Sequence, residues 1–189
     1  MATAPQHQDT LTELATFLVG EALCGMEIQQ IQEINKLPQM TRVPQAPADV
    51  LGILGREDVF AAALWDLQGV TQFVDAGFAA YCNYDGGGSR FGDTSVGAAT
   101  SNDETTSIYA SVDEGRDNRM ILVAVNKSTG TTSAEIAITH GLELTTGQVW
   151  LISGSSSTPT RGADIKSSSR NLFKLTMPAS SVTTLVLTR

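Results

Sequence analysis

Short clusters of acidic residues are the first groups in this sequence that could do chemistry. Asp103-Glu104 and Asp113-Glu114, with Asp117 close behind, fall in segments rich in turn-forming residues. Carboxylate oxygens on loops are the ligands that calcium prefers. A solvated acidic turn is the commoner origin of such clusters. The sequence therefore leaves calcium binding open and predicts no resident cofactor.

The histidines and the glycine run indicate no other metal or phosphate site. His7 and His140 have no second histidine or cysteine at ligand spacing. Gly86-Gly-Gly88 lacks the helix start and the Lys-Ser/Thr pair of a phosphate-binding loop, so we expect a flexible connector between domains. Cys24 and Cys82 are far apart in sequence, and we expect two small buried hydrophobic residues rather than a disulfide.

The charge of the chain restricts its partners. Twelve Lys and Arg against 20 Asp and Glu give a net charge of −8, whereas nucleic acids and anionic membranes both require a positive surface. A neutral ligand such as a glycan is compatible with this charge. The start of the chain is polar, and Glu13 and Glu21 interrupt the apolar residues that follow, so no export signal is predicted.

The first 82 residues alternate helical and strand-like patterns. Apolar residues at three- and four-residue steps predict an amphipathic helix over Leu11–Met26. Three prolines between 36 and 47 predict a loop, and a second helix is expected over 48–54 with Gly55 as its C-cap. The apolar run Val59–Trp65 is typical of a buried parallel strand, and a helix over 73–82 follows. This alternation is typical of a β/α fold.

A different pattern begins after Asp85-Gly-Gly-Gly88. Seven short apolar or alternating runs are separated by turn-forming residues, at 94–100, 106–112, 120–126, 132–139, 148–152, 172–176 and 182–188. Short strands at about ten-residue spacing predict an antiparallel β-sandwich. The Ser/Thr/Gly-rich segment 153–162 is expected to be a long surface loop.

The residues from Ala48 onward resemble glycoside hydrolase family 44. The resemblance rests on AGFAAYCNYDGGGSRFGDTSV, within which Asn83-Tyr-Asp85 and Phe91–Val96 are its strongest part, and it continues to the closing LTMPASSVTTLVL segment. This resemblance implies a mainly β chain, in which a C-terminal antiparallel β-sandwich follows the last β/α elements of an incomplete (β/α)8 barrel. The expected domains are 1–90, the truncated barrel end, and 91–189, the sandwich.

The resemblance also implies roles for two residues. Family members are retaining enzymes with a glutamate nucleophile after strand seven, and Ile31-Gln-Glu33-Ile-Asn35 partly matches that motif, so Glu33 is the candidate nucleophile. The segment Lys36–Pro44 departs from the family pattern, and a solvated helix position is the alternative for Glu33. Trp65, at the end of the implied eighth strand, is the candidate for stacking on a sugar ring, with interior packing as its alternative.

Three functional hypotheses follow from these residues. The first is the C-terminal part of a retaining endo-β-1,4-glycanase acting on cellulose, xyloglucan or mannan, inactive alone because the acid/base glutamate lies upstream of this chain. The second is a non-catalytic carbohydrate-binding or accessory sandwich, for which Tyr109, Trp150 and Phe173 are the available aromatic residues in the strands. The third is an inert fragment. The resemblance further implies an extracellular monomer with a β-linked polysaccharide as its partner.

Overall fold

The computed structural model describes residues 14–19, 22–27, 46–57, 59, 71–154 and 156–189. These residues fall into two compact units, within 1–40 and 41–189. The two helices fall in the same unit as the sandwich. The expected domains 1–90 and 91–189 stay a prediction. None of the described helices is long and apolar enough to cross a membrane.

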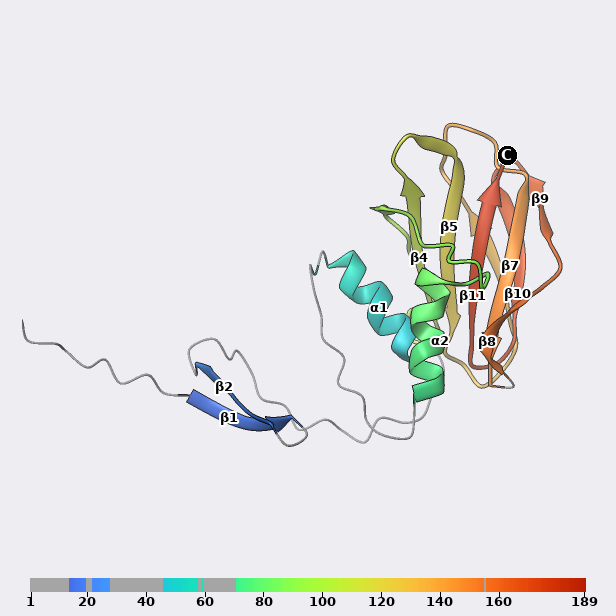
Figure 1. Ribbon diagram of the computed structural model, residues 1–189. Coiled ribbons are helices and arrows are strands. Elements are labelled where there is room, and N and C mark those ends of the chain that lie inside the picture. Colours follow the sequence, from blue (N-terminus) through green and yellow to red (C-terminus); the bar gives the residue numbers. More distant parts are fainter. Residues whose placement is uncertain (1–13, 20–21, 28–45, 58, 60–70, 155) are drawn as a thin grey trace, which may run out of the picture. The chain divides into compact units, whose positions relative to one another are not determined.

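The described part of the first unit is a two-stranded antiparallel hairpin, drawn in blue in Figure 1. Strand β1, Leu14–Val19, pairs with β2, Ala22–Glu27, with Val19 opposite Ala22. The helix expected over Leu11–Met26 is therefore wrong. Thr16, Phe17 and Val19 favour strand, and the sequence between the strands begins with Gly20, which suits a two-residue hairpin connection.

In the described part of the second unit, two helices come first. Helix α1 is Ala46–Arg56 and helix α2 is Thr71–Cys82, which confirms both expected helices. Gly55 is not a C-cap, because it lies inside the last turn of α1. Of the expected strand Val59–Trp65, only Val59 is described; it lies in no strand, and 60–65 are outside the described residues. Cys82 is exposed rather than buried.

Within 71–154 and 156–189, nine strands follow, and they confirm the predicted β-sandwich (Figure 1). The bounds are β3 Thr94–Val96, β4 Thr106–Asp113, β5 Arg116–Asn126, β6 Thr132–Ala137, β7 Thr146–Ser153, β8 Ser156–Arg161, β9 Ile165–Ser169, β10 Leu172–Met177 and β11 Ser181–Thr188. The surface loop expected over 153–162 is wrong, because β8 pairs with β7 there. The Ser/Thr-rich sequence of β8 has no alternation of apolar and polar residues that would predict a strand.

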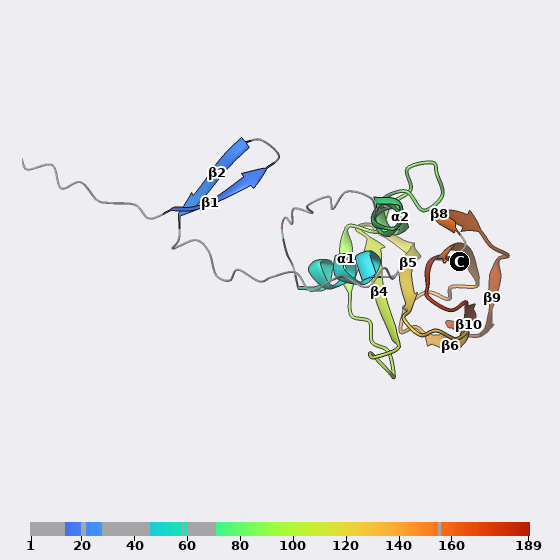
Figure 2. The ribbon, with the colours of Figure 1, turned by 90° about the horizontal axis from the view of Figure 1, so that it is seen from below.

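The strands form one antiparallel sheet that curls back on itself (Figure 2). Its order is β3-β4-β5-β11-β7-β9-β10-β6, with β8 as a further partner of β7. The strands β3, β4, β5, β11 and β7 form one layer, and β9, β10 and β6 turn over to form the other. In the described residues this order ends at β3 on one side and at β6 on the other, and β8, paired only with β7, is a further edge strand.

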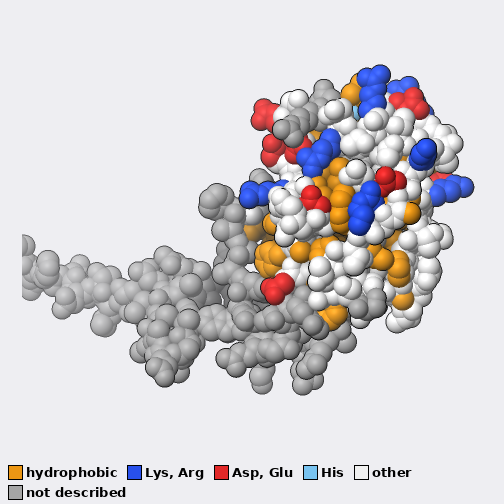
Figure 3. All heavy atoms as spheres, turned by 45° about the vertical axis from the view of Figure 1, so that its right-hand side comes forward, with side chains coloured by type: hydrophobic (Ala, Val, Ile, Leu, Met, Phe, Trp, Pro, Cys, Tyr) orange, Lys and Arg blue, Asp and Glu red, His pale blue; other side chains and the backbone are white. Residues whose placement is uncertain are grey.

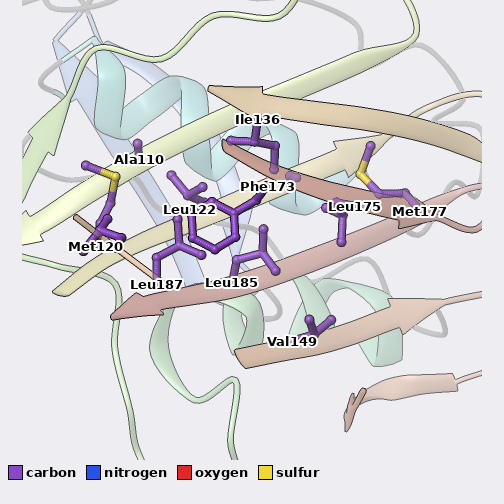
Figure 4. Packing of buried hydrophobic residues seen from close by; sticks show 12 residues of the cluster. Ala110, Met120, Leu122, Ile136, Val149, Phe173, Leu175, Met177, Leu185 and Leu187 are labelled. Carbon is purple, nitrogen blue, oxygen red and sulfur yellow. The ribbon is translucent and has the colours of Figure 1, made fainter. Parts of the chain in front are cut away.

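The core lies between the two layers (Figure 4). Leu185 and Leu187 of β11 meet Phe173 and Leu175 of β10, and all four are nearly inaccessible to solvent. The alternate residues of β11, such as Val186, face the other side of the sheet. The central strand is therefore buried on both faces, which accounts for its almost continuous apolar and threonine sequence.

A buried asparagine ties two turns of the sandwich together. The Nδ2 atom of Asn126 donates to the carbonyls of Gly130 and Pro178, at 2.8 Å and 2.7 Å. Its Oδ1 accepts from the hydroxyl of Ser128. The connection between β5 and β6 is thereby fixed to the connection between β10 and β11.

Candidate functional site

The two candidate site residues of the sequence lie outside the described residues. Glu33 falls in 28–45 and Trp65 falls in 60–70. Their predicted roles as nucleophile and sugar-stacking residue therefore stay predictions. Among the described residues, several polar side-chain contacts lie where the two helices cover the sheet.

Helices α1 and α2 lie against the outer face of the first layer, on strands β4, β5 and β11 (Figures 1 and 2). Small residues permit this close approach: Ala48, Ala76 and Ala80 are fully or almost fully buried. The hydroxyl of Thr184 on β11 donates to the carbonyl of Ala80 at 2.9 Å, and the Tyr81 hydroxyl donates to the carbonyl of Ala48 at 2.9 Å. These polar contacts bind α2 to the sheet and to α1.

Tyr109 of β4 anchors α1. Its hydroxyl donates to the Asp49 carboxylate at 2.6 Å, and Lys127 lies 3.7 Å from the other oxygen of that carboxylate. The Tyr109 ring lies so close to Gly52 that a β-carbon there would overlap it. Burial, reinforced by the bond to Asp49, raises the pKa of the Tyr109 hydroxyl above its usual range. Tyr109 is thus held neutral as a structural donor.

A second group of contacts joins the end of α2 to the sheet. Tyr84, only 2% exposed, accepts a hydrogen bond from Arg119, which also pairs with Asp113 at 2.8 Å. The Tyr84 ring lies 5.2 Å from that of Trp150, and the Arg161 guanidinium lies 4.8 Å from the centre of the Trp150 ring. Trp150 is therefore half-buried on the helix-covered face, neither in the inner core nor a free sugar platform.

The acidic loops have structural partners. Asp113 is paired with Arg119, and the Asp93 carboxylate accepts from the backbone of Glu114. Within the ranges that the structure describes, no group of three or more His, Cys, Asp or Glu residues could hold a metal ion. The described loops thus supply no assembled calcium site.

Asp85 organises the connector between α2 and β3. The hydroxyl of Ser89 donates to its carboxylate at 2.5 Å and the backbone of Gly87 donates at 2.8 Å, and these bonds lower the pKa of Asp85. A general acid in glycoside hydrolysis needs a raised pKa. Asp85 is therefore a turn-forming residue, and the glycines Gly86 and Gly88 take the positive φ values that the turn requires.

Sequence reasoning missed the Tyr109–Asp49 and Arg119–Tyr84 contacts. The signal for Tyr109 was present, since alternation along 106–112 places Tyr109 on the face opposite to Ile108. Nothing in the sequence indicated which helix would cover that face. The partner could be found only from the tertiary structure.

The fold and these contacts define a class: a β-sandwich that carries a pair of helices on one face. Solved structures of glycoside hydrolases share it. A family 44 xyloglucanase from Paenibacillus polymyxa superposes with a TM-score of 0.74 at 39% identity, covering 77% of this chain and 29% of that enzyme. A family 44 endoglucanase from Clostridium thermocellum gives a TM-score of 0.73 at 36% identity, covering 76% of this chain and 28% of that one.

Curated relatives agree with the structures. Endoglucanase A of Paenibacillus lautus is 36% identical over 143 residues, which are 75% of this chain and 20% of that protein. The β-mannanase/endoglucanase A of Caldicellulosiruptor saccharolyticus is 32% identical over 134 residues, 70% of this chain and 10% of that protein. The matched part of the chain belongs to glycoside hydrolase family 44 and is consistent with the C-terminal portion of such an enzyme. It spans a fifth or less of the length of these curated relatives.

A second match concerns the front of the chain. Residues 13–59 match the model of the CheW-like domain. This match includes the β1–β2 hairpin, the position of Glu33 and helix α1. The match covers less than half of the chain. It offers an alternative to a glycosidase barrel for the segment that contains Glu33.

Proposed function

We propose that this chain supplies the sandwich portion of a retaining endo-β-1,4-glycanase acting on cellulose, xyloglucan or mannan-type polysaccharides. The observation that carries the proposal is the 77% coverage of the chain by the Paenibacillus polymyxa xyloglucanase, at 39% identity. A structure of that enzyme with xyloglucan and the names endoglucanase and β-mannanase among the relatives support the substrate class. Secretion and a monomeric state are part of the same proposal.

Within this proposal, the sandwich supports the barrel and does not perform the chemistry. Retaining hydrolysis needs two carboxyl groups about 5 Å apart, one of them with a raised pKa. In the described residues, Asp49, Asp113 and Asp85 are each engaged by structural donors. The polar contacts from Tyr109 and Thr184 hold α1 and α2 at fixed positions on the sheet, as a support for barrel elements requires.

The isolated chain should accordingly not hydrolyse polysaccharides. We expect no reducing-sugar release from carboxymethylcellulose, xyloglucan or mannan with the purified chain. A chimera in which residues 71–189 replace the matching part of the Paenibacillus polymyxa xyloglucanase should regain xyloglucan hydrolysis, and the front part of that enzyme alone is the control. Turnover by the isolated chain, or an inactive chimera that is folded, would contradict the proposal.

Glu33 and Trp65 stay the proposed nucleophile and sugar-stacking residue. A second chimera, keeping residues 28–189 behind a front part that stops before strand seven, tests Glu33 directly. If Glu33 is the nucleophile, Glu33→Gln should lower turnover by about a thousandfold or more, since the covalent step is lost. Unchanged turnover would remove Glu33 from the mechanism and favour the CheW-like setting of residues 13–59.

The alternative of a carbohydrate-binding sandwich has weaker support. Of its three aromatic candidates, Phe173 is fully buried in the inner core and Tyr109 is buried beneath α1. The Trp150 ring already contacts Arg161 and Tyr84. On the face shown in Figure 3, acidic and basic side chains are interspersed with uncharged ones. Affinity electrophoresis of the chain in xyloglucan gels would detect such binding.

A further inference from the structure

Positive charge is concentrated in the last strands of the sandwich. Residues 156–189 contain five Lys or Arg residues and one acidic residue, whereas the whole chain has a net charge of −8. Three of these five basic residues are exposed and lie on β9, on β10 or in the turn between the two strands. We call this group the basic face, and it consists of Lys166, Arg170 and Lys174.

The two lysines of the basic face point away from the inner core. Phe173 of β10 lies opposite Ser167 of β9 and is buried in that core. Because successive residues of a strand point to opposite sides, Lys174 and Lys166 point outward, and both are exposed. Helices α1 and α2 pack on other strands, β4, β5, β8 and β11 (Figures 1 and 2). The described residues thus leave the basic face open to a partner.

Lys166 and Lys174 are like charges at neighbouring positions of adjacent strands. Both flank the Phe173–Ser167 pair on the same side, because Lys174 follows Phe173 and Lys166 precedes Ser167 in antiparallel strands. Like charges at facing positions destabilise a sheet. Among the described residues, no carboxylate lies within ion-pairing distance of either ammonium group. A bound anion would relieve this repulsion.

The turn between β9 and β10 holds the third basic residue in place. Arg170 and Asn171 connect the two strands directly, and Asn171 has a φ of 54°. The Asn171 side chain donates to the carbonyl of Leu142 at 3.0 Å, and Arg170 donates to the carbonyl of Gly141 at 3.2 Å. A guanidinium has five N–H donors, so most of those of Arg170 stay available to a ligand.

Exposed hydroxyl groups and one carboxylate lie beside these charges. Thr176 of β10 lies opposite Ser133 of β6, and both residues are exposed. Glu135 of β6 lies opposite Lys174 and is the acidic residue of these three strands. Their one aromatic residue, Phe173, is buried in the inner core, so a sugar ring has no aromatic surface to stack on here. A ligand of this surface would have to be recognised by charge and hydrogen bonds.

We propose that the basic face binds a carboxylated polysaccharide, one whose chain carries uronic acid units. The inference rests on the proposed function, because it takes a polysaccharide as the partner, and it adds an acidic glycan to the neutral ones named there. Arg170 can bind a carboxylate through two parallel N–H bonds, and the lysines attract it as point charges. The hydroxyls of Thr176 and Ser133 can exchange hydrogen bonds with those of the sugars.

The charge of the rest of the chain favours this partner over a nucleic acid or an anionic membrane. Outside residues 156–189, acidic residues far outnumber basic ones. Such a surplus repels a densely charged partner, and nucleic acids are bound by neutralising many phosphates. A uronate polymer carries its carboxylates on a chain rich in hydroxyl groups. Three basic residues with hydroxyls beside them therefore suit it better.

The probe for the basic face is a polygalacturonate of about ten sugar units, titrated at low salt into the isotope-labelled chain. We expect chemical-shift changes at the amides of β9, β10 and Arg170. Salt at about 0.5 M should abolish them, because it screens exposed charges. Fully methyl-esterified polygalacturonate and xyloglucan, which lack the charge, are the matched control ligands and should leave these amides unchanged.

Charge variants test the residues themselves. The double variant Lys166→Gln/Lys174→Gln should weaken polygalacturonate binding about fivefold, the effect of two exposed ion pairs. Arg56→Gln/Arg90→Gln removes the same charge from α1 and from the connector, and it should change the Kd by less than about twofold. Glu135→Gln should tighten binding about twofold, because it removes the carboxylate opposite Lys174. Circular dichroism checks that all three variants are folded.

Three outcomes would overturn the proposal. They are the absence of shifts on β9 and β10, an equal loss of binding in the two double variants, and tighter binding of a DNA duplex or of phosphatidylserine vesicles at the same amides. A chimera that hydrolyses xyloglucan, with a basic face that ignores polygalacturonate, would reject this inference and keep the proposed function. Binding of polygalacturonate together with a folded but inactive chimera would do the reverse.

Discussion

The β1–β2 hairpin and the sandwich are both antiparallel, but they differ in how much of each strand is covered. The hairpin has two strands, Leu14–Val19 and Ala22–Glu27, in a unit of its own. In the sandwich, β11 is paired on both sides and buried on both faces. Two strands are marginally stable in water, whereas three or more with a covered face are independently stable.

This difference explains why the secondary structure of the sandwich could be predicted from the sequence and that of the hairpin could not. The sandwich strands repeat a period of two over many segments, and the tertiary contacts reinforce that pattern. The front segment offered apolar residues that fit both a helix and a hairpin. Local spacing alone could not decide between them.

The largest effect on stability is expected from a substitution in β11, the strand that is buried on both faces. Leu185→Ala should lower the free energy of unfolding of the second unit by about 3 kcal/mol, because it leaves a cavity between β11 and β10. Urea denaturation followed by tryptophan fluorescence measures this. Leu23→Ala in the hairpin is the matched control and should leave the same transition in place. Equal losses would mean that the two units unfold together.

Substitutions of two glycines in helix α1 should have smaller effects on stability, and these should be opposite in sign. Gly52→Ala should destabilise the unit by about 2 kcal/mol, because its β-carbon would overlap the Tyr109 ring. Gly55→Ala meets no atom within 4 Å and should stabilise it by about 0.5 to 1 kcal/mol, since glycine is a poor helix residue. Thermal unfolding compares the two variants. Stabilisation by both would show that α1 does not pack on Tyr109 in solution.

The sequence predicted most of the fold of the second unit for physical reasons. Alternation and turn-forming residues located seven of its strands, and apolar spacing located both helices. The strands β8 and β9 were missed because Ser and Thr dominate them, and only their pairing with β7 and β10 makes them strands.

The candidate site was harder to predict. The Tyr109–Asp49 bond joins residues 60 positions apart, and neither residue signals the other in the sequence. The Gly86–Gly88 connector was recognised from its composition, but the bonds from Ser89 and Gly87 to Asp85 that shape it were not. Glu33 and Trp65 rest on family resemblance, and their positions lie outside the described residues.

The contact of Tyr109 with α1 should also make stability depend on alkaline pH. The pKa of this hydroxyl is raised in the folded state, while that of an unfolded tyrosine is about 10. Above pH 10 the unfolded chain releases this proton and the folded chain retains it, so stability present below pH 10 is lost as pH rises. Tyr109→Phe should lower stability by about 1 kcal/mol at pH 7 and flatten the alkaline slope. An unchanged slope would contradict the buried, neutral state of Tyr109.

The smallest effect is expected from removing the hairpin altogether. A chain that starts at Thr41 loses the first compact unit but keeps both helices and all nine sandwich strands. Its free energy of unfolding should therefore stay within about 0.5 kcal/mol of that of the whole chain, the range of changes away from structural contacts. In the whole chain, amides of β1 and β2 should exchange far faster than those of β5 and β11, because a two-stranded hairpin opens readily. Native-state hydrogen exchange of both chains measures the two quantities together. Comparable protection in the hairpin and in β11, or a loss of more than about 1 kcal/mol on deletion, would mean that the hairpin is stabilised by a partner beyond its own two strands.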